Sequence, residues 1–123
     1  MVILIVDGNL HRQRQLRSVL GSLGYKTAAV ECVPDFKAGL TTLRQRRFDC
    51  CFVAMCGTKE QTKSFLDGVR STSVTKSLSI IVFGPSTTKE DVVSAIEAGA
   101  NLFLTYPFTP EHVESALAQV STR

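Results

Sequence analysis

The sequence predicts an α/β fold in which a doubly wound parallel sheet lies between two layers of helices. Apolar strand-like runs alternate with amphipathic helical patterns five times along the 123 residues. Strands joined by crossover helices run parallel, with right-handed connections. The strand runs are almost continuously apolar, which is typical of strands covered on both faces. We therefore expect residues 1–123 to form a single three-layer domain with five strands and five helices.

Short apolar runs mark the expected strands. The clearest are Ile3-Leu4-Ile5-Val6, Cys50-Cys51-Phe52-Val53 and Ile80-Ile81-Val82-Phe83, because runs of this length suit a buried strand. In full, the expected strands span residues 2–6, 26–30, 50–54, 79–83 and 101–105.

Apolar residues at helical spacing predict the helices, which span residues 11–23, 34–45, 59–71, 89–98 and 110–120. Gly24 is expected to stop the first helix, whose inward face consists of Leu16, Val19, Leu20 and Leu23. Pro34 suits the first turn of the second helix, whose expected inward residues are Val33, Phe36, Leu40 and Leu43.

The remaining helices have core faces and caps of the same kind. The expected core residues are Phe65, Leu66 and Val69 in 59–71, and Val113, Ala116, Leu117 and Val120 in 110–120. Thr88, with Asp91 three residues later, predicts the start of 89–98. Thr109 is expected to cap 110–120, with Pro110 at its first position.

Composition excludes several classes of protein. The net charge of +3 and the scarcity of aromatic residues do not predict a nucleic-acid surface. No apolar stretch is long enough for a membrane span, and Met1 to Asp7 is too short for a signal-peptide core, so we expect a cytoplasmic chain. Basic residues cluster at 11–17 and 44–47, and we interpret them as solvated faces, with docking to an acidic partner or a nucleic-acid backbone as the alternative.

Cys32, Cys50, Cys51 and Cys56 lack the spacing of a zinc site. Neighbouring cysteines on a strand point to opposite faces, so Cys50 and Cys51 are not expected to bond to each other. We interpret all of them as small buried hydrophobes in a reducing compartment. A redox pair of Cys32 with Cys56 remains open.

The carboxyl ends of parallel strands meet at one edge of the sheet, where such folds place their chemistry. Here those ends present Asp7, Ala54, Gly84 and Tyr106. One acid, a methyl group, a hydrogen and a phenol are a poor basis for catalysis, so we do not expect an enzyme. The sequence also lacks a GxGxxG motif or a P-loop.

Four phrases together resemble the receiver domain of two-component signalling: Ile3-Leu4-Ile5-Val6-Asp7, Phe48-Asp49, Ala98-Gly99-Ala100 and Pro107-Phe108. The resemblance covers essentially the whole chain. It implies one receiver-like domain with the flavodoxin-like strand order 2-1-3-4-5. It also implies a cis peptide bond between Tyr106 and Pro107.

The chain departs from the receiver pattern where that family handles phosphate. Ala54 stands at the position of the phosphate-accepting aspartate, and Gly8 at that of the second metal-binding acid. Gly84 replaces the family's Ser or Thr, and Tyr106 replaces its lysine. A methyl group cannot act as a nucleophile, and Asp7 alone is a weak site for Mg²⁺. The resemblance therefore implies a degenerate phosphorylation pocket, with no metal and no cofactor expected.

Three residues at this edge are open to more than one interpretation. Asp7 is most simply a loop acid satisfied by backbone N–H groups, rather than an ion ligand. We expect Tyr106 to fill the emptied pocket and hypothesise that it locks one conformation. Phe103 corresponds to the family's switching aromatic, although a partly buried ring without a switching role is an equal alternative. Asp49 lies about five residues before Ala54, roughly 16 Å along a strand, and cannot replace the missing aspartate.

The resemblance implies a pseudo-receiver that cannot be phosphorylated, acting as an interaction or dimerisation module in bacterial signal transduction. We expect it to be the regulatory domain of a longer response regulator, with nucleic acid contacted only through an output domain outside these residues. The expected face comprises 89–98, 101–105 and 110–120, and its candidate residues besides Phe103 and Tyr106 are Lys89, Glu90, Glu97, Glu111 and Glu114. The alternative is a domain that senses a small ligand in the emptied pocket.

Overall fold

The computed structural model describes residues 1–25, 29–55, 58–85 and 88–121. In chain order the described elements are β1 (Ile3–Val6), α1 (Leu10–Ser22), β2 (Val30–Val33), α2 (Phe36–Gln45), β3 (Cys50–Ala54), α3 (Lys59–Ser71), β4 (Ser79–Gly84), α4 (Lys89–Ala98), β5 (Leu102–Thr105) and α5 (Pro110–Ser121). The strands form one parallel sheet in the order β2-β1-β3-β4-β5. The predicted fold class and strand order are confirmed.

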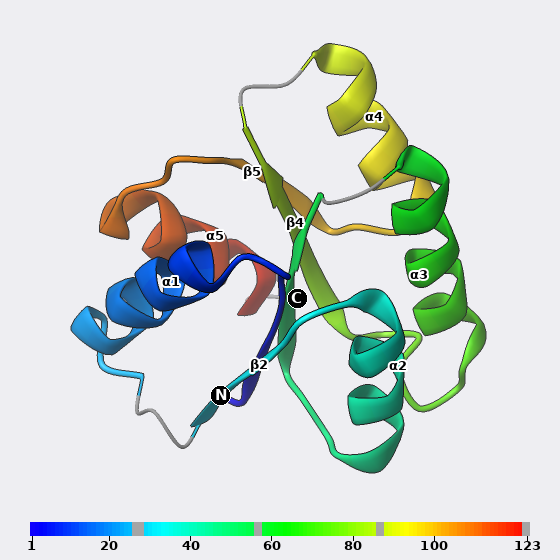
Figure 1. Cartoon of the computed structure of the whole chain (residues 1–123), viewed down its shortest axis with the longest axis horizontal. Coiled ribbons are helices and arrows are strands. Elements are labelled where there is room, and N and C mark those ends of the chain that lie inside the picture. The colour runs from blue at the N-terminus through cyan, green and yellow to red at the C-terminus, as the bar shows by residue number, and fades with distance from the viewer. Residues whose placement is uncertain (26–28, 56–57, 86–87, 122–123) are drawn as a thin grey trace.

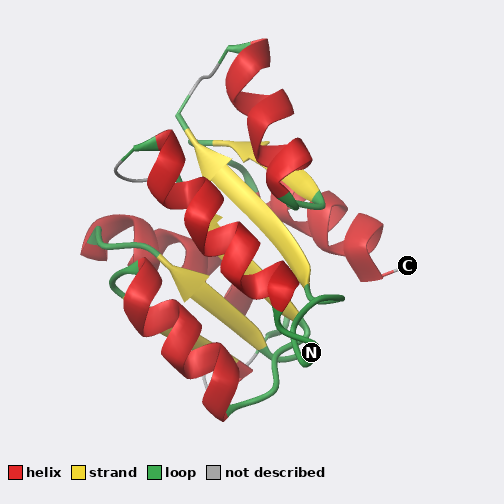
Figure 2. Cartoon of the chain, turned by 90° about the vertical axis from the view of Figure 1, so that its right-hand side faces the viewer, coloured by secondary structure: helices red, strands yellow, loops and turns green. Residues whose placement is uncertain are grey.

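Helices cover both faces of the sheet, as the apolar strands predict. Helices α1 and α5 lie on one face, and α2, α3 and α4 on the other (Figure 1). Figure 2 shows these last three helices in front of the strands. Each face has its own core: Leu16, Leu20, Val113 and Leu117 pack on one side, and Leu43, Phe65, Leu66 and Val69 on the other. Within the described residues, no helix is long and apolar enough to cross a bilayer.

The second strand is the main error of the sequence prediction. Of the predicted range 26–30, only Val30 belongs to the described strand, which continues to Val33, and residues 26–28 lie outside the described residues. Val33 is therefore a strand residue that pairs with Val6, not a helix residue. Strand β2 is at the edge of the sheet, so the half-exposed Glu31 is tolerated there and interrupts the apolar run.

The start of α2 also differs from the prediction. Asp35 is the N-cap, and its carboxylate accepts a hydrogen bond from the Ala38 amide at 2.8 Å. Pro34 consequently precedes the cap instead of occupying the first turn. The predicted cap of α4 is confirmed, because the Thr88 hydroxyl accepts from the Asp91 amide. Gly24 has a φ of 99°, as suits the residue that follows α1.

A half-buried guanidinium holds together the segments at the amino edge of the sheet. Arg70, in the last turn of α3, donates to the carbonyl oxygens of Lys76 at 2.9 Å and Leu78 at 2.6 Å. It also donates to the Gly99 carbonyl at 2.9 and 2.6 Å and to the Asn101 side chain at 2.8 Å. Desolvation lowers the pKa of Arg70. This one side chain joins the end of α4 to the segments that lead into β4 and β5.

The two cysteines of β3 behave as predicted. Cys50 and Cys51 are fully buried in cores on opposite faces of the sheet. Burial raises the pKa of the Cys50 thiol to about 12 and raises that of Cys51 as well, so both stay protonated and unreactive. Cys32 is half-buried in β2. Cys56 lies outside the described residues, so the redox pair with Cys32 stays an untested prediction.

Candidate functional site

The carboxyl ends of β1, β3, β4 and β5 meet at one edge of the sheet, as predicted. A cleft of about 190 Å³ lies there, and its lining includes Ala54, Gly84 and Tyr106 together with Arg12. Asp7 is fully buried and contacts the cleft through Arg12. Gly8 is exposed at the start of the following loop. The structure therefore brings together most of the residues of the predicted degenerate pocket and adds Arg12 to them.

Asp7 is held by the N-cap and the first turn of the following helix, α1. Its carboxylate accepts hydrogen bonds from Nε and Nη2 of Arg12, both at 2.8 Å, and from the Asn9 amide at 2.9 Å. The Asp7 carbonyl accepts from the Gln13 side chain, and the Asp7 amide donates to Val33 O at 3.0 Å. The predicted backbone partner is present, but the bidentate arginine was not predicted. Such charge-assisted pairs are about twice as strong as neutral hydrogen bonds.

The residues at this edge do not fit a magnesium ion. Magnesium binds through oxygen ligands in octahedral geometry, whereas both oxygens of Asp7 already accept from Arg12. An acid at position 8 would also meet a steric obstacle, since a Cβ there would lie 3.0 Å from the Pro34 carbonyl oxygen. In the described part of the chain, no group of three or more His, Cys, Asp or Glu side chains is placed to hold a metal.

Tyr106 connects the β5–α5 loop to α1. The half-buried tyrosine donates a hydrogen bond from its hydroxyl to the Gln15 side-chain oxygen. Its ring centroid lies 6.0 Å from Cζ of Arg12, within cation–π range. The ring also meets Phe108 edge to face at 5.5 Å, and Phe108 meets Phe83 in the same way at 5.7 Å. The bond between Tyr106 and Pro107 is cis, as the resemblance implies.

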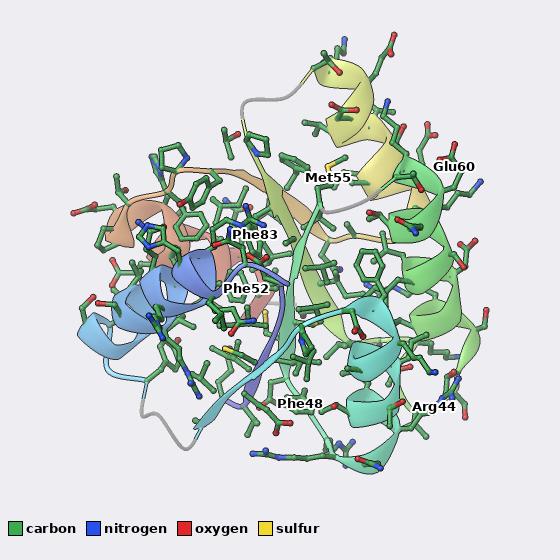
Figure 3. All side chains as sticks on the ribbon, in the orientation of Figure 1. Arg44, Phe48, Phe52, Met55, Glu60 and Phe83 are labelled. Carbon is green, nitrogen blue, oxygen red and sulfur yellow. The ribbon has the colours of Figure 1, made fainter. Side chains whose placement is uncertain are left out.

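The space beside Gly84 is occupied by two neighbouring side chains. A Cβ at Gly84 would lie 3.3 Å from Cβ of Met55 and 3.7 Å from Cζ of Phe103. Phe103 is half-buried and packs against the core beneath α2, α3 and α4. Met55 lies at the end of β3, beside β4 (Figure 3). A side chain at position 84 would therefore be crowded by Met55 and would touch the Phe103 ring.

The charged candidate interface residues lie on the surface, whereas Phe103 and Tyr106 are half-buried. Lys89, Glu90 and Glu97 are exposed on α4, and Glu111 and Glu114 are exposed on α5. Both helices contact β5. The sequence analysis missed two apolar members of the α4 surface, Val93 and Ile96, which are 42% and 43% exposed. Helical spacing is the signal that could have found them, because they lie three residues apart and opposite the buried Ala95.

Intramolecular contacts use several of the clustered basic residues. Arg12 pairs with Asp7, Arg17 donates to the Val30 carbonyl at 2.9 Å, and Arg46 pairs with Glu31 at 2.5 Å. Arg14 and Arg47 remain exposed. The interpretation as solvated faces agrees with the exposure of Arg14, Arg17, Arg46 and Arg47, whereas Arg12 is half-buried against Asp7.

Comparison with known proteins agrees with the architecture. The sequence model of the response regulator receiver domain matches residues 3–118. The transcriptional regulatory protein RprY of Bacteroides fragilis is 25% identical over 98% of this chain, which spans 49% of that relative's length. A provisionally assigned response regulator from Chloroflexus aurantiacus superposes with a TM-score of 0.89 at 23% identity, covering 99% and 98% of the two chains. The chemotaxis protein CheY4 of Vibrio cholerae gives 0.85 at 26% identity, covering 98% of each.

Proposed function

Since the chain belongs to the response regulator receiver domain family, we propose that it is a pseudo-receiver that works by protein contact without phosphorylation. Its role would be that of an interaction or dimerisation module in bacterial signal transduction, as the regulatory part of a longer response regulator. The chain spans only about half the length of RprY, which is named as a transcriptional regulatory protein. The observation that carries the proposal is the contact between Arg12 and Asp7 beside Ala54.

Three features of the cleft support the loss of phosphoryl chemistry. Ala54 offers no oxygen to accept a phosphoryl group, and Arg12 already neutralises Asp7. Gly84 has no hydroxyl and Tyr106 has no ammonium, so neither position supplies the group that would stabilise charge on the equatorial oxygens. The cleft of about 190 Å³ is also smaller than the roughly 300–1,000 Å³ of ordinary ligand pockets. Sensing of a small ligand is therefore not favoured.

The same residues support a single fixed conformation. The bond from Tyr106 to Gln15 joins the β5–α5 loop to α1, and the stacking of Tyr106 near Arg12 joins it to the Asp7 pair. Phe103 already occupies the space beside Gly84, so its ring needs no hydroxyl movement to reach that edge. We infer that the domain presents one surface at all times.

We place the contact surface on α4, β5 and α5. Its exposed members include Val93 and Ile96 beside the charged Lys89, Glu90 and Glu97, with Glu111 and Glu114 on α5. An apolar centre with a charged rim suits a protein interface. Whether the partner is a second copy or another protein is decided by measurement of the mass in solution.

The proposal is tested with acetyl phosphate and Mg²⁺, followed by intact-mass spectrometry of the 123-residue chain. The expected result is no added phosphate in the natural chain or in an Ala54→Asp variant, because Arg12 and Gly84 remain. A phosphate adduct in the cleft of the natural chain would refute the proposal. Sedimentation of an Ile96→Asp variant is the second test. Its oligomeric mass, or its retention by a bound partner, should fall relative to Arg14→Gln, a change at an exposed position of α1 outside the proposed surface.

A further inference from the structure

A second cleft lies at the opposite end of the sheet. It encloses about 200 Å³, and we call it the amino-edge cleft after the residues that define it: Arg46, Arg47, Phe48, Asp49, Val74 and Leu78. It lies where β3 and β4 begin. Phe48 and Arg44 are at the end of the molecule away from Met55 (Figure 3). Nothing in the proposed loss of phosphorylation uses this cleft.

The rim of the amino-edge cleft exposes an apolar side chain on a fixed loop. Val74 is 74% exposed, the largest value among the described large hydrophobic residues. Its loop is held in place, since the Thr75 hydroxyl donates to the Val69 carbonyl at 2.6 Å and the Leu78 amide donates to the Thr75 carbonyl at 3.0 Å. Arg70 fastens the same loop through Lys76 and Leu78. An ordered loop loses little conformational entropy when a partner binds to it.

Basic residues outnumber acidic residues on the segments around the cleft. Asp49 accepts a hydrogen bond from the Val2 amide at 2.7 Å, and Glu31 is paired with Arg46. Arg47 lines the cleft and is exposed, while Arg44 and Lys76 are exposed on the segments that form its walls. Positions 44, 46, 47 and 76 thus carry four positive charges near the two carboxylates of Glu31 and Asp49, and one of the four, Arg46, is paired with Glu31.

We propose that the amino-edge cleft docks an acidic segment of a partner protein, with one aliphatic side chain placed against Val74. Charge complementarity selects the acidic residues, since arginine binds carboxylates in bidentate geometry. The exposed valine and the buried Phe48 and Leu78 of the cleft lining select the aliphatic side chain. A nucleic-acid backbone could also pair with the arginines. Its phosphates, however, would make no apolar contact with Val74 and would be repelled by the carboxylate of Asp49.

The test uses a fluorescent eight-residue peptide of glutamate and aspartate around one leucine, with a lysine-substituted peptide as its control. Backbone amide shifts of the ¹⁵N-labelled chain locate the site, and fluorescence anisotropy gives the affinity. Arg47→Glu is compared with Arg14→Glu, which makes the same charge change at an exposed position on α1. Val74→Ser tests the apolar contact.

The expected shifts fall at residues 43–49 and 74–78. Arg47→Glu should weaken binding about tenfold, which is the cost of one strong charge contact, and Val74→Ser about threefold. Arg14→Glu should change it less than twofold, and thermal unfolding should show all variants folded. Shifts elsewhere, no binding at millimolar peptide, or equal losses for the two arginine variants would overturn the proposal. A DNA duplex that shifts the same amides at lower concentration would also overturn it.

Discussion

The guanidinium of Arg12 meets both carboxylate oxygens of Asp7 at 2.8 Å, although the aspartate ends a strand and the arginine lies in the next helix. The Asp7 side chain is completely buried, while that of Arg12 is 32% exposed. The positive charge beside Asp7 is therefore the guanidinium of Arg12.

Replacement of Arg12 by methionine should destabilise the protein, because it leaves a buried carboxylate without its charged partner. We expect a loss of about 2 kcal/mol, below the usual cost of a fully buried pair because water reaches Arg12. Urea unfolding measures it. Arg14→Met is the matched control and should have almost no effect. If the double variant Asp7→Asn, Arg12→Met is no more stable than Arg12→Met alone, the unpaired carboxylate is not the cause of the loss and the prediction is contradicted.

The contact between Tyr106 and Gln15 should be separable from the packing of the tyrosine ring. Tyr106→Phe keeps the edge-to-face contact with Phe108 and removes only the hydroxyl. We expect a loss of about 1 kcal/mol or less, as is usual for one hydrogen bond that is partly open to solvent. A double-mutant cycle with Gln15→Ala measures the coupling by chemical denaturation. Additive losses would show that the hydroxyl and the amide do not act as a pair.

Restoration of a hydroxyl at position 84 should be costly. A Cβ there falls 3.3 Å from Cβ of Met55, and the further atoms of a threonine would approach Phe103. We expect Gly84→Thr to destabilise the fold by about 1–3 kcal/mol, the usual range for overpacking. Gly84→Ala should cost less, and Met55→Ala in the same chain should relieve part of the loss. Thermal denaturation of the set measures this, and an unchanged midpoint for Gly84→Thr contradicts the crowding.

The ion pair that joins α3 to α4 predicts a pH dependence. Lys59 Nζ lies 2.8 Å from Asp91 Oδ1, and hydrogen bonding to Lys59 lowers the pKa of Asp91 from its ordinary 3.8. Because the pKa is lower in the folded state, the contribution to stability is present above about pH 4 and is lost as the pH falls through the folded value. Asp91→Asn should flatten the acid limb of the stability profile between pH 5 and 3. High salt should reduce the difference, since Lys59 is exposed and water reaches part of Asp91.

The buried strands were predicted well because both of their faces are covered, so that nearly every position in them is apolar. Strands β1, β3 and β4 are apolar at almost every position, and their bounds differ from the predicted ones by one residue at most. Strand β2 was misplaced because an edge strand can carry a charge such as Glu31, which forms its ion pair only in the folded chain.

The residues named for the site were predicted better than their contacts. Parallel topology alone brings Ala54, Gly84 and Tyr106 to one edge. The pairing of Arg12 with Asp7 depends on how α1 begins after its cap at Asn9, and no periodic pattern records that turn. The cap of α3 at Thr58, by contrast, has a readable signal in Gln61 three residues later, and the sequence analysis missed it.

Ala54 has a consequence for how such a module would be regulated under the proposed function. Because the alanine cannot carry a phosphoryl group, no covalent modification at this position persists after a stimulus has ended. The fraction of partner engaged would then follow mass action alone, set by how much of each protein the cell makes and removes. Its response time would be that of protein synthesis and turnover.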